Sequence, residues 1–271
     1  MIGQTSTLNT VDYWIKTDQV PRFMIISGAI GSGRTTISKE IAKRMRAYVI
    51  ECELSVDAVR EAVKNCYKCS GNTVYLFKDA DKMSTAAKNA MLKITEEPPR
   101  QAHFIVTVQN PENMLETLRS RATNLQMAPY SAEELDIFYH DYTHKHNRLI
   151  REVCDTPGMM LEMEKIDVEE LLEFCNTIVD NIQTVTGVNA FKIVQRIKLK
   201  EDGNGHDPEL FFHCMKYALL QRIHNDEYTM EERLKFSRML MTTCQYHREF
   251  NITGVKKDAA LDMWVLSMRE C

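Results

Sequence analysis

The stretch "SGAIGSGRTT", Ser27 to Thr36, decides the fold class of this 271-residue chain. Its spacing matches the phosphate-loop pattern G-x-x-x-x-G-K-[ST] at every defined position except one, where Arg34 stands in place of lysine. The apolar run "RFMIIS" precedes the loop, and "TTISKEIAKRMRAYVI", which has helical periodicity, follows it. The stretch therefore predicts a strand, a loop and a helix, the local structure of a phosphate-binding site.

The loop supplies the first candidate site. Glycines let backbone N–H groups curl around phosphates, the following helix directs its positive end at them, and a hydroxyl such as that of Thr35 can hold Mg²⁺. Arginine keeps the charge of the usual lysine, but it is a planar fork on a longer stem, so the exchange is not conservative in a tight cradle. The candidate nucleotide-binding residues are Gly28, Gly31, Ser32, Gly33, Arg34, Thr35 and Thr36.

Outward from the loop, strands alternate with helices. Residues 47–52, 73–79 and 102–109 are nearly continuous apolar runs, and the helical patterns 55–66 and 84–97 separate them. Strands of this kind predict an α/β fold with a parallel sheet that is covered on both faces.

After about residue 130 the pattern becomes helical throughout. Ser131 with Glu134 and Thr229 with Glu232 have the spacing of capping boxes, and Asp207 before Pro208 is a typical helix start. The glycine-rich and acidic stretch Lys200–Pro208 predicts a loop between helices.

Composition narrows the class of protein. The net charge of −4 argues against coating nucleic acid by overall charge, so any DNA contact must be local. The eight cysteines lack the dense spacing of a secreted disulfide framework, and no leader or membrane-spanning run is evident. These features predict a cytoplasmic protein without membrane contact.

No metal site is predicted. Cys66-x-x-Cys69 has only Cys52 nearby as a third thiol, which makes a poor structural zinc site, and the eight histidines show no ligand spacing.

The second candidate site follows the third strand, in "VYLFKDADKM". In a working nucleotide hydrolase this strand ends in an acidic residue for Mg²⁺, often followed by a glutamate that orients the attacking water. Here Lys78 stands at the first position and Asp79 at the second. A lysine at a magnesium position repels the metal. The alternative is that both residues simply end a strand at the surface.

Three longer segments carry a family resemblance. "KDADKMSTAAKNAMLKITEEPP", Lys78 to Pro99, resembles the acidic box, helix and L-E-E-P-P run of clamp-loader AAA+ subunits. "MIGQ" at the start resembles their I-G-Q opening, and "QNPENMLETLRSRA", Gln109 to Ala122, resembles their sensor strand and S-R-C motif. The resemblance spans residues 2 to about 160 by motif and is closest to the delta-prime type of bacterial DNA polymerase III and its phage relatives.

The resemblance implies a three-part chain. It implies an AAA+ P-loop parallel-sheet module over residues 1–130, a small helical lid over 131–166, and an all-α collar over 167–271 through which such subunits form a ring. A generic helical bundle is the alternative for the last part.

The resemblance also implies a catalytic role for Arg121. Ser120-Arg121 match the motif that carries the family's trans-acting arginine finger, and Ala122 replaces its cysteine. Such an arginine reaches the γ-phosphate held by a neighbouring subunit. The alternative for Arg121 is a surface salt bridge or another structural role.

Departures from the family pattern point toward lost hydrolysis. Besides Arg34, Lys78 and Asp79, the polar sensor position falls at Val108 or Gln109, and Met159 stands where the lid usually carries a basic nucleotide sensor. We therefore expect a delta-prime-like subunit with weak or absent ATPase activity, which requires no cofactor and for which ATP or ADP binding at the loop stays open.

The implied partners are other clamp-loader subunits in a ring, a sliding clamp, and primer–template DNA through weak local contacts. Lys82, Ser84 and Lys88 are the candidate DNA contacts, because phosphate contacts come from such side chains and from helix N-termini; an ordinary solvated helix start is the alternative. Two other functions remain open: a gamma-like subunit that hydrolyses its own ATP with Arg34 and Asp79, and a P-loop kinase, for which no acceptor site is visible.

Overall fold

The computed structural model describes residues 2–96, 99, 101–144, 147–184, 186–198, 207–251 and 256–271. The chain divides into two compact units. The sheet unit comprises Met1–Phe138 with Thr156–Gly158, and the helical unit comprises Tyr139–Asp155 with Met159–Cys271. Most of the predicted loop Lys200–Pro208 lies outside the described residues. The division into module, lid and collar stays a prediction.

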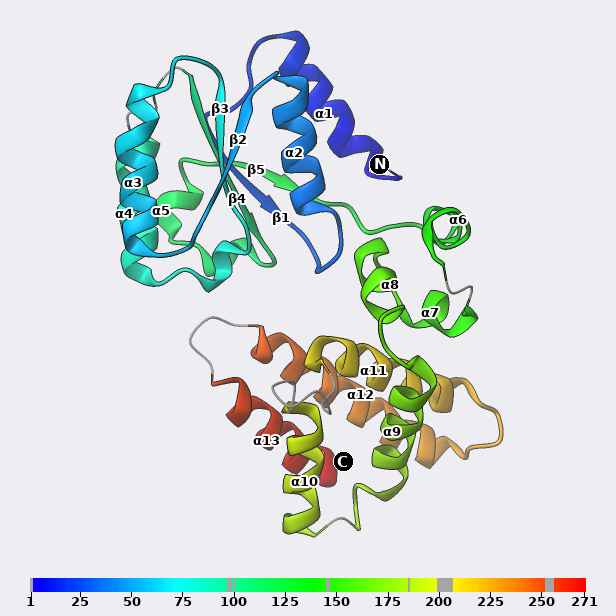
Figure 1. Cartoon of the computed structure of the whole chain (residues 1–271). Helices are drawn as coiled ribbons and strands as arrows, with labels where there is room; N and C mark the ends of the chain where they lie inside the picture. The colour runs from blue at the N-terminus through cyan, green and yellow to red at the C-terminus, as the bar shows by residue number, and fades with distance from the viewer. Residues whose placement is uncertain are drawn as a thin grey trace. The chain divides into compact units, whose positions relative to one another are not determined.

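Five parallel strands form the sheet in the order β2-β3-β4-β1-β5 (Figure 1). They are β1 (Phe23–Ser27), β2 (Tyr48–Cys52), β3 (Thr73–Phe77), β4 (Ala102–Val108) and β5 (Thr123–Gln126). The first four were predicted, whereas β5 was not. β3 ends two residues earlier than predicted, so Lys78 and Asp79 lie just beyond its carboxyl end. This edge of a parallel sheet is where ligands of α/β proteins bind.

Helices cover both faces of the sheet (Figure 1). On one face α3 (Val56–Asn65) and α4 (Thr85–Glu96) pack on one apolar cluster, and on the other face α1 (Thr5–Lys16) and α2 (Arg34–Arg44) pack on a second. Neighbouring strand residues alternate between the clusters, as Ile25 and Ile26 of β1 do, because successive side chains of a strand point to opposite faces. The central strands are therefore buried on both sides, as predicted.

The edge strand β2 corrects one part of that prediction. Its run Tyr48-Val49-Ile50 was read as buried, but Tyr48 is 78% exposed and the two residues after it are exposed as well. β2 pairs with β3 on one side only, since it ends the sheet. Apolar character alone does not separate an edge strand from a central one.

Short elements lie between the strands and helices of the sheet unit. The 3₁₀ turns are η1 (Cys66–Lys68), η2 (Ala80–Lys82) and η3 (Pro111–Asn113), and α5 is the one-turn helix Glu116–Arg119. η2 follows β3, while η3 and α5 follow β4. They therefore hold the acidic segment and the segment with Arg121.

The helical unit is built on α11 (Pro208–His224), which packs against α9 (Val168–Asn181) and α12 (Met230–Phe250). α13 (Lys257–Arg269) packs against α12 and α10 (Gly187–Lys198), and α7 (Arg148–Val153) contacts α11. At the centre the fully buried Trp264 meets the rings of Phe211 and Phe212 edge to face at 5.3 and 5.8 Å. α6 (Ala132–Tyr142) and α8 (Pro157–Met163) begin in the sheet unit and end in this one.

The predicted helix starts are confirmed. Ser131 and Glu134 exchange side-chain to backbone hydrogen bonds, as a capping box requires. Thr229 and Glu232 do the same at the start of α12, and the Asp207 carboxylate accepts the N–H of Glu209 at the start of α11.

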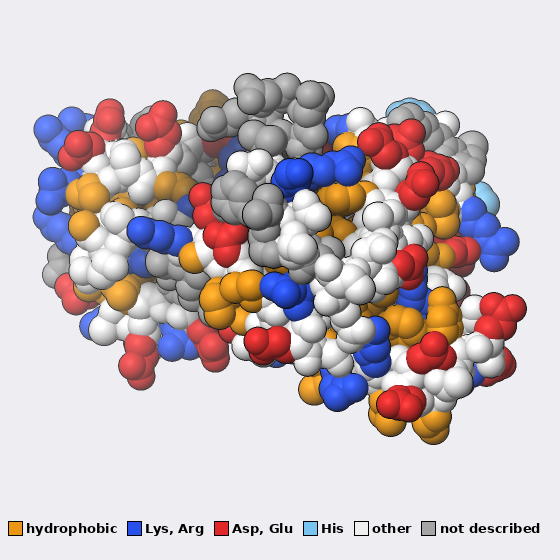
Figure 2. All heavy atoms as spheres, turned by 90° about the horizontal axis from the view of Figure 1, so that it is seen from below, with side chains coloured by type: hydrophobic (Ala, Val, Ile, Leu, Met, Phe, Trp, Pro, Cys, Tyr) orange, Lys and Arg blue, Asp and Glu red, His pale blue; other side chains and the backbone are white. Residues whose placement is uncertain are grey.

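The surface carries mixed charge. On the face drawn in Figure 2, acidic and basic side chains are interspersed among polar and apolar ones. Among the described helices, none combines the length and apolar character that crossing a membrane requires.

Candidate functional site

The phosphate loop has the predicted backbone. β1 ends at Ser27, Gly31 and Gly33 take left-handed conformations with φ of 75° and 91°, and α2 begins at Arg34. A Cβ on Gly28 would lie 2.7 Å from the Cβ of Met127, so a side chain has no room there. The glycines are therefore required by the curve and by close packing.

The carbonyl groups of the loop are bound by the protein itself. Those of Ile30, Gly31 and Ser32 each accept one hydrogen bond. The donors are the Thr156 hydroxyl at 2.8 Å, the Gly158 N–H at 3.0 Å and the Tyr130 hydroxyl at 2.9 Å, respectively. These contacts fix the curve of the loop without a ligand.

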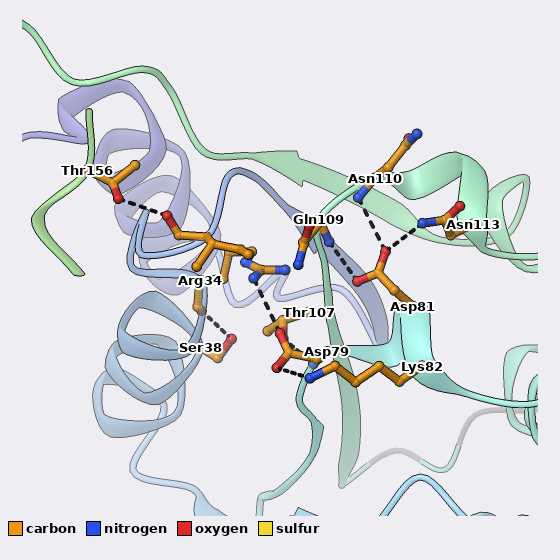
Figure 3. A network of polar contacts seen from close by, with 11 residues as sticks. Arg34, Ser38, Asp79, Asp81, Lys82, Thr107, Gln109, Asn110, Asn113 and Thr156 are labelled. Carbon is orange, nitrogen blue, oxygen red and sulfur yellow. Dashed lines mark hydrogen bonds and ion pairs between the residues drawn. The ribbon is translucent and has the colours of Figure 1, made fainter. Parts of the chain in front are cut away.

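Arg34 turns toward the end of β3 (Figure 3). Its Nη2 lies 3.3 Å from Oδ1 of Asp79, and its side chain is 8% exposed. Burial lowers the pKa of the Arg34 guanidinium, while the carboxylates of Asp79 and Asp81 oppose that shift. A buried guanidinium needs such a partner, because an unpaired buried charge costs several kcal/mol.

Asp79 is held in place from two sides. Its backbone is left-handed at φ 52°, a conformation that aspartate tolerates better than most residues, and its N–H donates to the Thr107 hydroxyl at 3.0 Å. Besides Arg34, the Lys82 ammonium lies 3.5 Å from its second carboxylate oxygen. Both oxygens of Asp79 are thus occupied by cationic groups of the chain.

The Lys78 side chain does not face Asp79, the partner of Arg34. It pairs with the edge strand β2. Its Nζ lies 2.7 Å from one oxygen of Glu51 on β2, and Lys39 of α2 lies 2.7 Å from the other. The two ammonium groups lower the pKa of Glu51 to about 2. The residue at the expected metal-binding position is therefore a cation that already has its own partner.

Asp81 organises the segment after β4. Its buried carboxylate accepts the N–H of Gln109 at 2.7 Å, the N–H of Asn110 at 3.3 Å and the side-chain amide of Asn113 at 3.1 Å (Figure 3). Of the two residues considered for the sensor position, Val108 is fully buried in the apolar core, whereas Gln109 lies just after the strand. The sequence analysis did not single out Asp81, although it is the second aspartate of the K-D-A-D run.

The loop residues fit a phosphate but not a metal. Among the described residues, Ser32 Oγ and Arg34 Nη1 are buried hydrogen-bonding atoms with no partner. Each could donate to a phosphate oxygen, so the residues fit a phosphate group. They do not fit Mg²⁺, which needs carboxylate and hydroxyl oxygens, because Asp79 is paired with Arg34 and Lys78 adds positive charge.

Arg121 lies at the surface just after α5. Its Nη1 donates to the backbone carbonyl of Thr117 at 2.9 Å, its Nη2 lies 3.6 Å from Glu96, and its side chain is 40% exposed. Within the part of the chain that the structure describes, the guanidinium therefore has an exposed ion pair and one backbone acceptor. Met159, by contrast, is buried in α8 and offers no charge.

One of the candidate DNA contacts is corrected. Lys88 is buried and donates to the carbonyl of Asn113 at 2.6 Å, so its ammonium supports the segment after β4. Lys82 is exposed, and the Ser84 hydroxyl caps α4 by accepting the N–H of Ala87.

Cys52, Cys66 and Cys69 are the three thiols that were considered above as a zinc site. Burial raises the pKa of both Cys52 and Cys66 to about 11, and the Cys69 thiol contacts the Tyr75 hydroxyl at 3.3 Å.

The helical unit holds a group that sequence reasoning missed. Within the described residues, Glu209, His213 and His247 are the one set of three whose ligand atoms lie within metal-binding range of one another. The i,i+4 spacing of Glu209 and His213 is a weak signal by itself. The third member is 34 residues farther along the chain, and only the packing of α11 on α12 brings it close.

Residues 49–131 match the family model described as DNA polymerase III, delta subunit. Over 79 residues the chain is 40% identical to the delta' subunit of DNA polymerase III from Escherichia coli, covering 28% of this chain and 24% of that protein. The chain is related to clamp-loader AAA+ subunits.

Two further matches extend the relationship. The chain is 25% identical over 166 residues to the gamma subunit of DNA polymerase III from Buchnera aphidicola subsp. Schizaphis graminum, covering 50% of this chain and 46% of that protein. A crystal structure of a gamma subunit-related protein from Thermotoga maritima has a TM-score of 0.54 at 17% identity, covering 96% of this chain and 98% of that one. The matches to these two DNA polymerase III subunits each span less than half of the relative's own length.

These matches confirm the predicted fold class. The α/β module with a parallel sheet and a helical C-terminal region is the AAA+ arrangement of clamp-loader-like proteins. The roles of the individual site residues are not tested by the matches.

Proposed function

We propose that this chain is a delta-prime-like, ATPase-deficient clamp-loader subunit that supplies Arg121 to the nucleotide of a neighbouring motor subunit. The observation that carries the proposal is the ion pair between Arg34 and Asp79, 3.3 Å apart. The phosphate-loop cation and the acidic residue at the second position of the box neutralise each other.

Hydrolysis by the chain itself is disfavoured on electrostatic grounds. Nucleotide hydrolysis depends on a metal that bridges the phosphates and on a residue that orients the attacking water. Here the metal position is held by Lys78, bound to Glu51, and both oxygens of Asp79 are occupied by Arg34 and Lys82. Phosphate binding without hydrolysis is compatible with this arrangement.

Donation of Arg121 is favourable. Its present partner Glu96 is 60% exposed, and ion pairs of that kind contribute at most about 1 kcal/mol. An arginine that reaches a γ-phosphate contributes roughly 10³- to 10⁵-fold in rate in enzymes that use one. Exchange of Glu96 for a phosphate would therefore cost little and supply much.

The proposed assembly follows from this role. Residues 167–271 act as the collar of a ring of clamp-loader subunits, residues 131–166 act as a lid, and the ring loads a sliding clamp onto primer–template DNA in the cytoplasm. No cofactor is required by this chain, and ATP or ADP can rest in the loop as a structural ligand.

Reconstitution tests the proposal. The chain alone, with ATP and Mg²⁺, is expected to show negligible turnover. In the complete complex with motor subunits, clamp and primed DNA, Arg121→Ala is expected to lower ATP turnover by about 10³-fold or more. Arg60→Ala is the matched control, because Arg60 is likewise an exposed arginine with an exposed ion pair, to Asp57 at 3.7 Å.

Two outcomes would reject the proposal. Unchanged turnover of a competent complex with Arg121→Ala would remove the arginine-finger role. Robust Mg²⁺-dependent hydrolysis by the isolated chain, lost on Arg34→Ala, would favour the gamma-like alternative. That alternative is motivated by the buried, unpartnered donors Ser32 Oγ and Arg34 Nη1, which fit a phosphate.

A further inference from the structure

Three metal-ligating side chains meet between two helices of the helical unit. Glu209 and His213 lie one turn apart on α11, which places them on the same face of that helix, and His247 lies on α12. Their ligand atoms all lie within 4.8 Å of one another, and Nε2 of His247 is 2.8 Å from Oε2 of Glu209. This group is far from the phosphate loop in sequence, and the proposed ring function does not use it.

The two imidazole rings are held by packing. The His247 ring stacks on Phe212 with centroids 4.9 Å apart and meets the His213 ring edge to face at 5.3 Å. His247 is 9% exposed, and α11 and α12 pack along their length. Little rotamer freedom remains to be lost when a ligand binds, which favours affinity.

The donor set suits a divalent cation. Imidazole nitrogen is the commonest protein ligand of metals, and a carboxylate supplies the negative charge that a bound cation favours. The group therefore offers one carboxylate and two imidazoles.

We propose that Glu209, His213 and His247 bind one divalent ion of the zinc class, which joins α11 to α12 with a water as the fourth ligand. Two imidazoles and a carboxylate form a donor set that zinc accepts in tetrahedral geometry. With metal–ligand bonds of about 2.1 Å, tetrahedral ligand atoms lie about 3.4 Å apart. Movements of the side chains by roughly 1 Å would bring the ligand atoms to this spacing. The ion would then replace the direct Glu209–His247 hydrogen bond.

The competing explanation is an interhelical hydrogen bond without a metal, and a single variant separates the two. His213→Gln removes one metal ligand and leaves the Glu209–His247 bond in place. His224→Gln on the same helix is the matched control, because that histidine is exposed and contacts the carbonyl of Leu220 at 2.8 Å.

The experiment uses the full chain, free of tags and stripped with a chelator, titrated with Co²⁺ and Zn²⁺. We expect one ion per chain, the intense visible absorption of tetrahedral Co²⁺, its displacement by Zn²⁺, and a rise in the unfolding temperature with metal. His213→Gln should weaken binding at least about 10-fold, the lower end of what losing even an outer-shell partner costs. His224→Gln should bind as the unaltered chain does.

Equal Co²⁺ affinity of the unaltered chain and His213→Gln would overturn the site, as would the absence of binding. X-ray absorption of the unaltered chain with one equivalent of Zn²⁺ gives a reading that depends on no variant. Two imidazole nitrogens with light oxygen ligands would support the site, whereas sulfur ligation would place the metal on the cysteines and reject it.

Discussion

Arg34 at the start of α2 and Asp79 just after β3 are joined by an ion pair of 3.3 Å. The pair ties the phosphate loop directly to the segment that usually provides metal ligands. In a nucleotide hydrolase a phosphate and a metal stand between those two segments. Here the contact is made by the chain itself, which is why stability and anion binding at this site should be coupled.

Asp79→Ala should weaken the fold and strengthen anion binding at once. Arg34 loses its partner, and alanine tolerates the left-handed backbone at this position less well than aspartate does, so the free energy of unfolding should fall by about 1–3 kcal/mol. The freed guanidinium should tighten the binding of ADP without Mg²⁺ by about 10-fold, which corresponds to about 1.4 kcal/mol. Urea unfolding and calorimetric titration measure the two effects.

Asp57→Ala is the control for Asp79→Ala, since Asp57 is 96% exposed and pairs only with Arg60. It should change neither quantity. If Asp79→Ala lowered stability without any gain in ADP affinity, Arg34 would not be a phosphate ligand, and the loop would serve architecture alone.

Features of the fold that depend on a few neighbouring residues were predicted from the sequence, and features that depend on strand order were not. Apolar runs gave β1 to β4, and side-chain caps such as Ser131 and Thr229 gave helix starts, because each depends on a few neighbouring residues. β5, "TNLQ", has too few apolar residues to stand out, and its pairing with β1 is what makes it a strand. The exposure of β2 depends on strand order, which no local pattern encodes.

The sequence indicated which residues form the candidate site but not how they pair. The loop residues, and the departure from the family pattern at Lys78 and Asp79, can be identified from the sequence. The partner of Arg34 lies 45 residues away, and that of Lys78 lies on the edge strand. Lys88 follows Ser84 in a stretch that is typical of an exposed helix start. Its ammonium is nevertheless buried and donates to the carbonyl of Asn113. Long-range pairing decides which charges stay available, and it follows only from the fold.

Gly158→Ala should disturb the phosphate loop. A Cβ at this position would lie 2.5 Å from the Cα of Gly31 and 2.9 Å from its carbonyl oxygen, and both are backbone atoms that cannot swing aside. The hydrogen bond from the Gly158 N–H to the same carbonyl would be strained as well. We expect a loss of about 1–3 kcal/mol in the free energy of unfolding, measured in urea.

Gly71→Ala provides the opposite case. Among the described residues, and apart from its two chain neighbours, no atom lies within 4 Å of the position its Cβ would take. The substitution should therefore be neutral, or should stabilise the fold by up to about 1 kcal/mol because alanine restricts the unfolded chain. Equal behaviour of the two variants would mean that the close approach of Gly158 to Gly31 does not constrain the loop.

Glu51 should report the position of Lys78 through its pKa. The lysines Lys39 and Lys78 lower the pKa of Glu51 from the ordinary 4.5 to about 2. Because the folded-state pKa is the lower one, the stability from this group is present above about pH 4.5 and is lost as the pH falls toward 2. Carboxyl NMR titration should show the pKa of Glu51 rising in Lys78→Ala and unchanged in Lys82→Ala. An unshifted Glu51 in the unaltered chain would leave Lys78 free to face the loop.

Arg121→Ala should leave the fold intact, which separates a functional arginine from a structural one. The ion pair with Glu96 is 3.6 Å long and exposed on both sides, so its loss should change the free energy of unfolding by less than about 0.5 kcal/mol. Glu96→Gln should have an equally small effect, since it breaks the same pair from the other side. A loss above about 2 kcal/mol in urea unfolding for Arg121→Ala would show that Arg121 supports its own segment. A turnover defect in the complex could then arise from misfolding, whereas a stable variant that abolishes turnover leaves contact with a neighbour's nucleotide as the explanation.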